Sequence, residues 1–236
     1  MTALAAEAAQ VLGMAITPEQ EALFDVYASE LAAWNAHTNL TAIIDADAVR
    51  IRHFLDSLTV AQVIPLRPGL RLIDVGSGAG FPGLPLKIVY PELDVTLLEA
   101  TGKKVAFLRH ICERLGLSGV GFVNARAEEA GQDPAHRAAY DVTVARAVAR
   151  LPILLEYLLP LTAVGGLAIA MKGSTAHVEA ASQKALHALG GRLRGIETFH
   201  LPGLDEPHHL AIVEKVAPTP PLYPRRPGLP TQKPLL

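Results

Sequence analysis

The stretch from Asp74 to Lys87, DVGSGAGFPGLPLK, holds the residues of this sequence best suited to grip a nucleotide-like ligand. Gly76, Gly78 and Gly80 alternate with small residues after a short apolar run, and an apolar segment with two prolines follows. Glycine lets the backbone approach a ligand closely and adopt a positive φ. A strand that feeds such a turn and then continues into a helix is a nucleotide-binding arrangement.

Two phosphate-binding patterns fit this turn poorly. The dinucleotide fingerprint G-x-G-x-x-G places a glycine where this sequence has Phe81. The P-loop ends in Lys-Ser or Lys-Thr, and neither pair follows the glycines. A Rossmann-like turn that serves NAD stays open as the alternative, but the sequence favours a ligand without a diphosphate.

Two acids near the turn indicate the kind of ligand. Asp74 lies two residues before the first glycine, and Glu99 ends the next predicted strand. A carboxylate repels a diphosphate and attracts an ammonium group, and an acid at the end of the second strand suits the hydroxyls of a ribose. S-adenosylmethionine has a ribose, an amino group and no phosphate. The pattern Asp-x-Gly-x-Gly-x-Gly with the later glutamate resembles the class I methyltransferase signature, so we predict this cofactor for Asp74, Gly76, Gly78 and Glu99.

Ala127 and Glu128 follow the third predicted strand. In this kind of fold the adenine lies beyond the end of that strand, so we predict that these two residues hold it through a backbone amide and a side chain. The alternative is that Glu128 and Glu129 simply begin a solvated turn.

The sequence lacks the residues that two kinds of methyl transfer require, and this limits the possible methyl acceptors. Methylation of pyrimidine C5 needs a cysteine nucleophile, but the single cysteine, Cys112, lies on an apolar helical stripe and suits a core position. Methylation of exocyclic amines usually uses an Asn/Asp-Pro-Pro-aromatic loop, and none follows the fourth predicted strand. A ring nitrogen such as guanine N7 needs no base, because its lone pair lies in the ring plane and alignment is the main requirement. Carboxylate and hydroxyl acceptors stay open.

Arg146 ends the fourth predicted strand, where such an enzyme faces its acceptor. Arginine commonly pairs with O6 and N7 of guanine, but donation to N7 would block the nucleophile. We therefore predict that Arg146, the candidate catalytic residue, contacts O6, a phosphate or the methionine carboxylate. The alternative is an arginine paired with a structural acid.

Alternating strands and helices must position the candidate ligand-binding residues. Thr17 to Gln20 predicts a capped helix start, and residues 47–60 predict a second helix. From residue 70 strands and helices alternate, which predicts an α/β fold with a largely parallel, Rossmann-like class I methyltransferase sheet and an antiparallel last strand. We predict an N-terminal helical cap at 1–66, the methyltransferase domain at 67–217 and a basic, proline-rich, extended tail at 218–236.

Composition limits the partners. The 236 residues carry a formal net charge of −2, so contacts to nucleic acid have to come from local basic patches. From Ala217 on the chain has no acid but contains Arg225, Arg226 and Lys233, and we expect this tail to touch something anionic. The single cysteine, the start without positive charge and the interrupted apolar segments predict a cytoplasmic protein with no membrane contact and no metal.

Six motifs resemble those of the bacterial 16S rRNA guanine-N7 methyltransferases, formerly called glucose-inhibited division protein B. They are Asn39–Ile43, Arg52–Leu58, Leu72–Ile88, Lys103–Leu108, Ala145–Leu151 and Ala170–Gly173. The resemblance covers nearly the whole chain. It implies methyl transfer from S-adenosylmethionine to N7 of a guanine in the conserved loop of 16S rRNA near the decoding centre, with 16S rRNA or the small ribosomal subunit as partner. Cofactor contacts then fall on Gly76, Phe81, Glu99, Ala100, Thr101, Ala127, Glu128 and Arg146.

The resemblance also implies where RNA is bound. Asn39, Arg52, His53 and Asp56 are candidates for the rim between cap and sheet, although His53 also suits a buried interhelical position and Arg52–Asp56 a surface pair. The expected basic contacts are Lys103, Lys104, Arg109, Lys172, Arg225 and Arg226. Two other functions stay open: methylation of another RNA position or a small molecule, and a non-catalytic assembly factor that binds rRNA.

Overall fold

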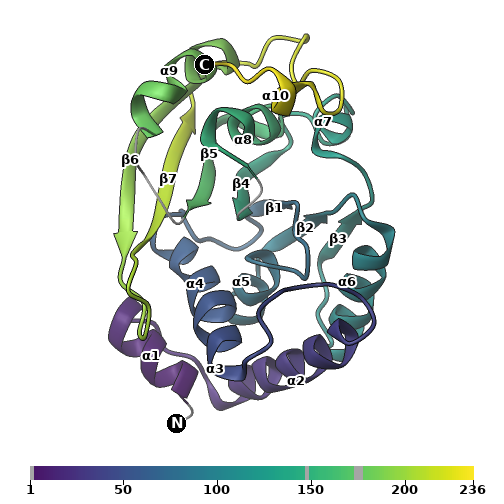
Figure 1. The fold of residues 1–236 in the computed structure, drawn as a ribbon, viewed down its shortest axis with the longest axis vertical. Helices are drawn as coiled ribbons and strands as arrows, with labels where there is room; N and C mark the ends of the chain where they lie inside the picture. The colour runs from purple at the N-terminus through teal and green to yellow at the C-terminus, as the bar shows by residue number, and fades with distance from the viewer. Residues whose placement is uncertain (1–2, 147–148, 173–177) are drawn as a thin grey trace.

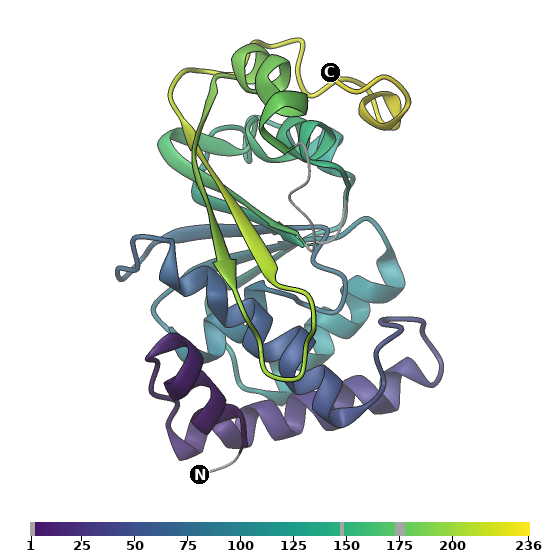
Figure 2. The same cartoon turned by 60° about the vertical axis from the view of Figure 1, so that its left-hand side comes forward.

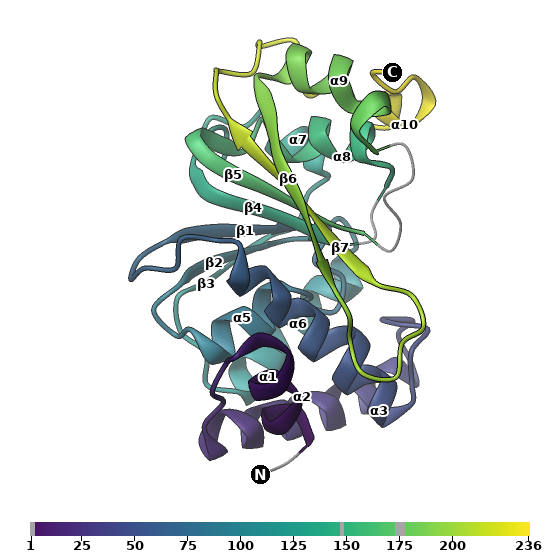
Figure 3. The same cartoon turned by 90° about the vertical axis from the view of Figure 1, so that its left-hand side faces the viewer.

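A seven-stranded sheet in the order β3-β2-β1-β4-β5-β7-β6 forms the centre of the molecule, and helices cover both of its faces (Figures 1 and 3). The computed structural model describes residues 3–146, 149–172 and 178–236, with the backbone alone at 172 and 178–181. The strands are β1 Arg71–Val75, β2 Asp94–Leu98, β3 Val120–Val123, β4 Tyr140–Arg146, β5 Thr162–Lys172, β6 Gly191–Phe199 and β7 His208–Lys215.

The strand directions match those predicted from the sequence. Strands β1 to β5 pair in parallel, and β7 is antiparallel to both β5 and β6. From β1 the chain moves outward through β2 and β3, then crosses back to place β4 on the other side of β1. In open α/β sheets the crevice that holds a ligand forms at such a reversal, beyond the carboxyl ends of the strands.

Each face of the sheet has its own hydrophobic core. Helices α5 (Gly83–Val89) and α6 (Gly102–Arg114) lie on one face, and α7 (Ala127–Ala130), α8 (Leu151–Leu158) and α9 (Val178–Leu189) lie on the other. Successive strand residues alternate between the two cores, as Leu72 and Ile73 do on β1. Within the described ranges, no helix has the length and apolar character needed to cross a bilayer.

The N-terminal helices pack beneath α5 and α6 (Figure 3). The capping box of Thr17 and Gln20 is confirmed at the start of α2 (Pro18–Asn35), which follows α1 (Ala3–Leu12). The predicted helix at 47–60 is a continuous helical run of four pieces, α3 Ala46–Val49, η1 Arg50–Leu55, α4 Asp56–Leu58 and η2 Thr59–Gln62. Its η1 piece is a π-helical turn that carries Arg52 and His53, and such turns are frequent at functional sites.

Two segments distant in sequence return to this framework. The β6–β7 hairpin extends past the rest of the sheet toward the N-terminal helices (Figure 2), where Leu204 and Leu210 join their core. The C-terminal segment folds back onto α7 and α8 and contains the short helix α10, Leu229–Gln232 (Figure 1). The prediction of an extended tail is therefore wrong, because side chains elsewhere in the chain hold its backbone.

Candidate active site

Two cavities lie beyond the carboxyl ends of the central strands and share Gly76 as a common wall. The smaller, of about 190 Å³, is lined by the ends of β1, β2 and β3 and by α7 and α8. The larger, of about 540 Å³, lies between the glycine turn, the tip of β4 and the helical run 46–62. A ligand that occupies both cavities has to pass the backbone at Gly76, a residue with no side chain of its own.

The glycine turn is held in place by the cap. Gly76, Gly78 and Gly80 have positive φ of 72°, 58° and 97°. The buried Tyr27 of α2 donates its hydroxyl to the carbonyl of Ala79, and a Cβ on Gly80 would lie 2.5 Å from that hydroxyl oxygen. The conformation of the loop is therefore fixed by close contact with a helix some fifty residues earlier in the chain.

Glu99 explains why this turn does not suit a diphosphate. One oxygen of its carboxylate accepts the amide N–H of Gly78 at 3.0 Å, and the other accepts that of Thr101 at 2.8 Å. The loop amide that would face a phosphate in a dinucleotide site is thus already paired with a negative charge. Glu99 also lines the smaller cavity, where it can accept hydroxyl groups of a ribose.

The side chain of Asp74 does not point into either cavity, although its charge and its position before the glycines predicted a ligand contact. Its side chain is fully buried on the α5 face of β1, and Oδ2 accepts the amide N–H of Gly83 at 2.8 Å. Oδ1 has no hydrogen-bond partner among the described residues, and Asp74 lines neither cavity. Burial raises the pKa of this carboxyl to about 7, against the opposing effect of the Gly83 hydrogen bond. Asp74 supports the turn from beneath, and a direct contact with the cofactor is not what this geometry offers.

The raised pKa predicts a specific pH dependence of stability. The folded protein keeps the Asp74 proton up to about pH 7, whereas the unfolded chain releases it near the ordinary aspartate pKa of 3.8. This contribution to the free energy of unfolding is fully present below the unfolded pKa and is lost as the pH rises through 7. In urea titrations, the stability of the wild type relative to Asp74→Asn should fall by roughly 2–3 kcal/mol from pH 5 to pH 8.

The exposed Asp205 supplies a matched control for that measurement. Asp205→Asn removes the same charge without burial, so its difference from the wild type should not change over this range. A pH-independent difference for Asp74→Asn would mean that the carboxyl is ionised in the folded protein throughout.

The smaller cavity contains most of the residues predicted to hold the nucleoside. Ala100, Ala127 and Glu128 line it together with Glu99, and Tyr157 of α8 adds an aromatic side chain that was not predicted from the sequence. Glu128 is buried, and its Oε1 accepts the amide N–H of Gly228 at 3.0 Å, so it does not begin a solvated turn. Thr101 lies at the start of α6 and contributes through its backbone bond to Glu99.

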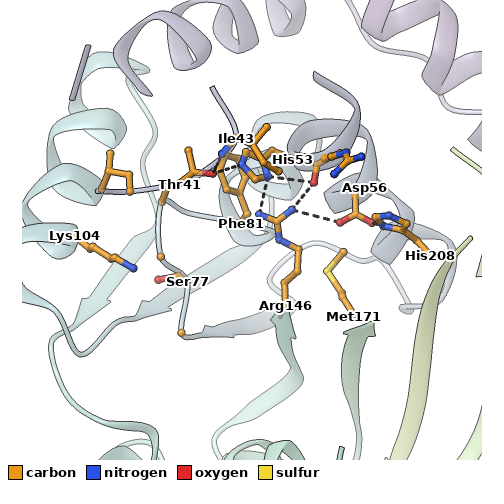
Figure 4. A pocket seen from close by; sticks show the side chains of 15 residues that line it. Thr41, Ile43, His53, Asp56, Ser77, Phe81, Lys104, Arg146, Met171 and His208 are labelled. Carbon is orange, nitrogen blue, oxygen red and sulfur yellow. Dashed lines mark hydrogen bonds and ion pairs between the residues drawn. The ribbon is translucent and has the colours of Figure 1, made fainter. Parts of the chain in front are cut away.

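Arg146 reaches from the tip of β4 across the larger cavity to the π-helical turn (Figure 4). Its Nη1 donates to the carbonyl of Arg52 at 2.6 Å and lies 3.4 Å from Asp56 Oδ2, while Nη2 contacts His53 Nδ1 at 3.0 Å. The guanidinium also lies over the ring of Phe81, 5.0 Å from its centroid. Arg146 therefore ties the sheet to the cap, and among the described residues its Nε has no hydrogen-bond partner.

His53 is neutral at physiological pH. Burial, reinforced by the charge of Arg146, lowers the pKa of His53 to about 4. Because the Arg146 guanidinium can only donate, His53 Nδ1 is the acceptor of that contact, and its 3.2 Å approach to the Arg52 carbonyl is not a hydrogen bond in this tautomer. The proton is then on Nε2, which donates to Thr41 Oγ1 at 2.8 Å. The imidazole stacks on Phe81 with ring centroids 4.5 Å apart, so the aromatic residue that breaks the dinucleotide pattern supports the wall of this cavity.

Asp56 does not form the surface pair with Arg52 that was one sequence-based alternative. It is buried, and its carboxylate contacts Arg146 and, through Oδ1, His208 Nδ1 at 2.8 Å. His208 begins β7 and lines the cavity with Met171 of β5 (Figure 4). Neither His208 nor Met171 was predicted from the sequence, because nothing near them in the chain signals a partner so far away.

The single cysteine does not suit nucleophilic catalysis. Burial raises the pKa of the Cys112 thiol to about 12, so it is a core residue and not a nucleophile. In the described ranges, no group of three or more His, Cys, Asp or Glu side chains is placed to hold a metal ion.

The predicted RNA-binding residues have different environments. Arg52 and Lys104 line the larger cavity, Asn39 is exposed just before the cavity residues Leu40 and Thr41, and Lys103 and Arg226 are exposed. Arg109 is exposed with its guanidinium 4.6 Å from the centroid of Phe122. The side chain of Lys172 lies outside the described residues. Arg225 is paired with the fully buried Glu156, so the prediction that it is free for RNA is wrong.

Comparison with known proteins places this site in a family. A family model described as rRNA small subunit methyltransferase G matches residues 20–204. The chain belongs to this family. Ribosomal RNA small subunit methyltransferase G of Acetivibrio thermocellus is 46% identical over 229 residues, 97% of this chain and 94% of the relative. The protein of the same name from Chloroflexus aggregans is 50% identical over 224 residues, 94% of this chain and 93% of the relative.

Solved structures resemble this member of the family in fold alone. Precorrin-6y C5,15-methyltransferase of Geobacter metallireducens has a TM-score of 0.50 at 13% identity, over 68% of this chain and 87% of that one. TrmN of Thermus thermophilus has a TM-score of 0.50 at 22% identity, over 69% and 48%. These likenesses, with the sheet order, confirm the predicted class I methyltransferase fold.

Proposed function

We propose that this chain transfers the methyl group of S-adenosylmethionine to N7 of a guanine in 16S rRNA, in the conserved loop near the decoding centre. Membership of the rRNA small subunit methyltransferase G family supports an rRNA substrate. The observation that carries the proposal is the pair of cavities that meet at Gly76, one suited to a nucleoside and the other walled by Arg146, Phe81 and His53.

The donor set of the smaller cavity fits S-adenosylmethionine. Glu99 and Glu128 offer carboxylate oxygens for ribose hydroxyls and for the exocyclic amine of adenine, and each oxygen can accept more than one hydrogen bond. Gly76 and Gly78 let the rest of the molecule pass close to the backbone. When bound, this cofactor supplies the methyl group on a positively charged sulfonium, and that charge moves to the purine when N7 takes the methyl.

The larger cavity suits an acceptor that needs no general base. Among the described residues that line it, the acidic and histidine side chains that could take a proton are Asp56, His53 and His208, and each is hydrogen-bonded to another side chain. Guanine N7 carries no proton, so what this site has to supply is a flat wall and a fixed orientation. Phe81 and His53 provide the wall, and the Nε of Arg146 can donate to O6 or a phosphate while N7 stays free.

Basic side chains around the larger cavity support an RNA approach from this side. Arg52 and Lys104 line the cavity. The exposed Lys103 lies next to Lys104 in the first turn of α6. We assign the exposed Arg109 and Arg226 to more peripheral phosphate contacts. Because sequence-specific RNA recognition generally targets unstacked loop bases, the target guanine has to leave its stack to enter the cavity.

The deciding experiment is to map N7-methylguanine in 16S rRNA from cells that lack this protein. We expect one N7-methylguanine in the conserved loop near the decoding centre to disappear and to return on complementation with the wild type. Complementation with Arg146→Met should not restore it. A methyl group on any other atom, or unchanged 16S rRNA, would replace this proposal by one of its alternatives.

A further inference from the structure

The C-terminal segment is tied to α8 by a buried ion pair. Glu156 is fully buried, and its carboxylate accepts Nε of Arg225 at 2.8 Å, Nη2 at 2.6 Å and the backbone N–H at 2.9 Å. A buried carboxylate is costly unless it is paired and hydrogen-bonded. The position of Arg225 is therefore specified by the core of the protein and not by solvent or RNA.

The same segment also holds two walls of the smaller cavity. The amide N–H of Gly228 donates to Glu128 Oε1 at 3.0 Å, and the hydroxyl of Thr231 lies 3.2 Å from that of Tyr157. Glu128 and Tyr157 both line this cavity, whereas Gly228 and Thr231 do not. Each wall residue thus has one face toward the cavity and one partner in the C-terminal segment.

Upstream contacts fix the path that brings the segment there. The guanidinium of Arg137 donates to four carbonyls, those of Gly131, Thr219, Pro220 and Tyr223. Gln132 donates to the carbonyls of Pro221 and Pro224. A run of prolines presents carbonyls without matching N–H donors, and these two side chains satisfy them.

We propose that residues 225–232 form a positioning element for the nucleoside half of the cofactor. By holding one oxygen of Glu128, Gly228 restricts the carboxylate and leaves the other oxygen to accept the exocyclic amine of adenine. The hydroxyl of Thr231 likewise restricts the orientation of the Tyr157 phenol through their hydrogen bond. The inference rests on the proposed cofactor. It assigns to Arg225 and the segment that it anchors an effect on cofactor affinity, in place of the direct RNA contact that the sequence predicted for Arg225.

Titration of S-adenosylhomocysteine into the full-length protein by calorimetry tests this. Arg225→Met should weaken binding by about tenfold, because a hydrogen-bonded charge that anchors the segment is lost. Thr231→Val changes one hydroxyl outside the cavity and should weaken binding by about two- to threefold. Arg192→Met is the matched control, because it breaks the exposed pair with Glu214 on β6 and β7 and should bind as the wild type does.

A second measurement covers the case in which Arg225→Met does not fold. In the wild type, hydrogen exchange of the Gly228 amide should slow when S-adenosylhomocysteine is added, since binding and docking of the segment stabilise each other. The inference would be overturned if Arg225→Met and Thr231→Val both fold and bind S-adenosylhomocysteine as the wild type does. It would also be overturned if the exchange rate of the Gly228 amide did not change when the ligand is added. A wild type that binds no S-adenosylhomocysteine would instead overturn the proposed function.

Discussion

Replacing Arg146 by methionine is expected to lower kcat/KM for methyl transfer to rRNA by roughly 100-fold or more, the size of effect seen when an oriented charged donor is removed from an active site. Methionine keeps much of the length of the side chain but removes the donors to the Arg52 carbonyl, His53 and Asp56. The tip of β4 then loses its tie to the cap, and the wall of the larger cavity loses its orientation. Steady-state kinetics on small subunits gives the value directly.

Arg146→Lys separates the charge from the geometry. A lysine keeps the positive charge but cannot make the planar set of contacts to three partners, so we expect partial activity. The His53 pKa is an independent readout by NMR, because the Arg146 charge helps to hold it near 4, and it should rise in Arg146→Met but not in Arg146→Lys. If Arg146→Met leaves both cofactor affinity and RNA kinetics unchanged, the assignment of Arg146 is wrong.

Gly80→Ala should be among the most damaging single-methyl substitutions in this chain. The φ of Gly80 is 97°, and an added Cβ would lie 2.5 Å from Tyr27 Oη and 2.6 Å from Leu84 Cδ1. Crowding and backbone strain together should lower the free energy of unfolding by about 2–4 kcal/mol. Because the displaced loop carries the amide that Glu99 accepts, affinity for S-adenosylhomocysteine should also fall by about tenfold or more.

Gly69→Ala is the control for that substitution. Gly69 has a φ of 69°, and no atom lies within 4 Å of the position that an added Cβ would take, so it reports the backbone contribution of about 1 kcal/mol alone. Urea unfolding of both variants gives the difference that belongs to crowding. Equal losses would show that the loop relaxes around the new methyl and that Tyr27 does not fix it.

Features that depend on neighbouring residues could be predicted from the sequence. The capping box at Thr17 and the antiparallel last strand follow from local chemistry or from the absence of a crossover helix. The burial of Asp74 also obeys a local rule, because strand alternation places it on the same face as Leu72. The prediction that Asp74 faces a ligand followed from its charge and its place before the glycines, whereas its register on the strand decides where its side chain points.

Features that depend on distant partners could not be predicted in the same way. His208 and Tyr27 belong to the site only because the β6–β7 hairpin and α2 fold against it. The basic composition of the tail predicted a contact with an anionic partner. The acid that pairs with Arg225 instead lies 69 residues earlier in this chain, in an apolar helix. Charge patterns along a chain show which groups need partners and not where those partners are.

The shared wall at Gly76 has a consequence for inhibitor design. On the proposed function, a compound that joins an adenosine-like group to a guanine-like group should engage both cavities at once, because binding of the first group raises the effective concentration of the second. The linker has to be slim and uncharged or cationic where it passes Gly76, because the neighbouring Gly78 amide is already taken by Glu99. Anionic linkers, which are common in nucleotide mimics, should therefore bind poorly where the two cavities meet.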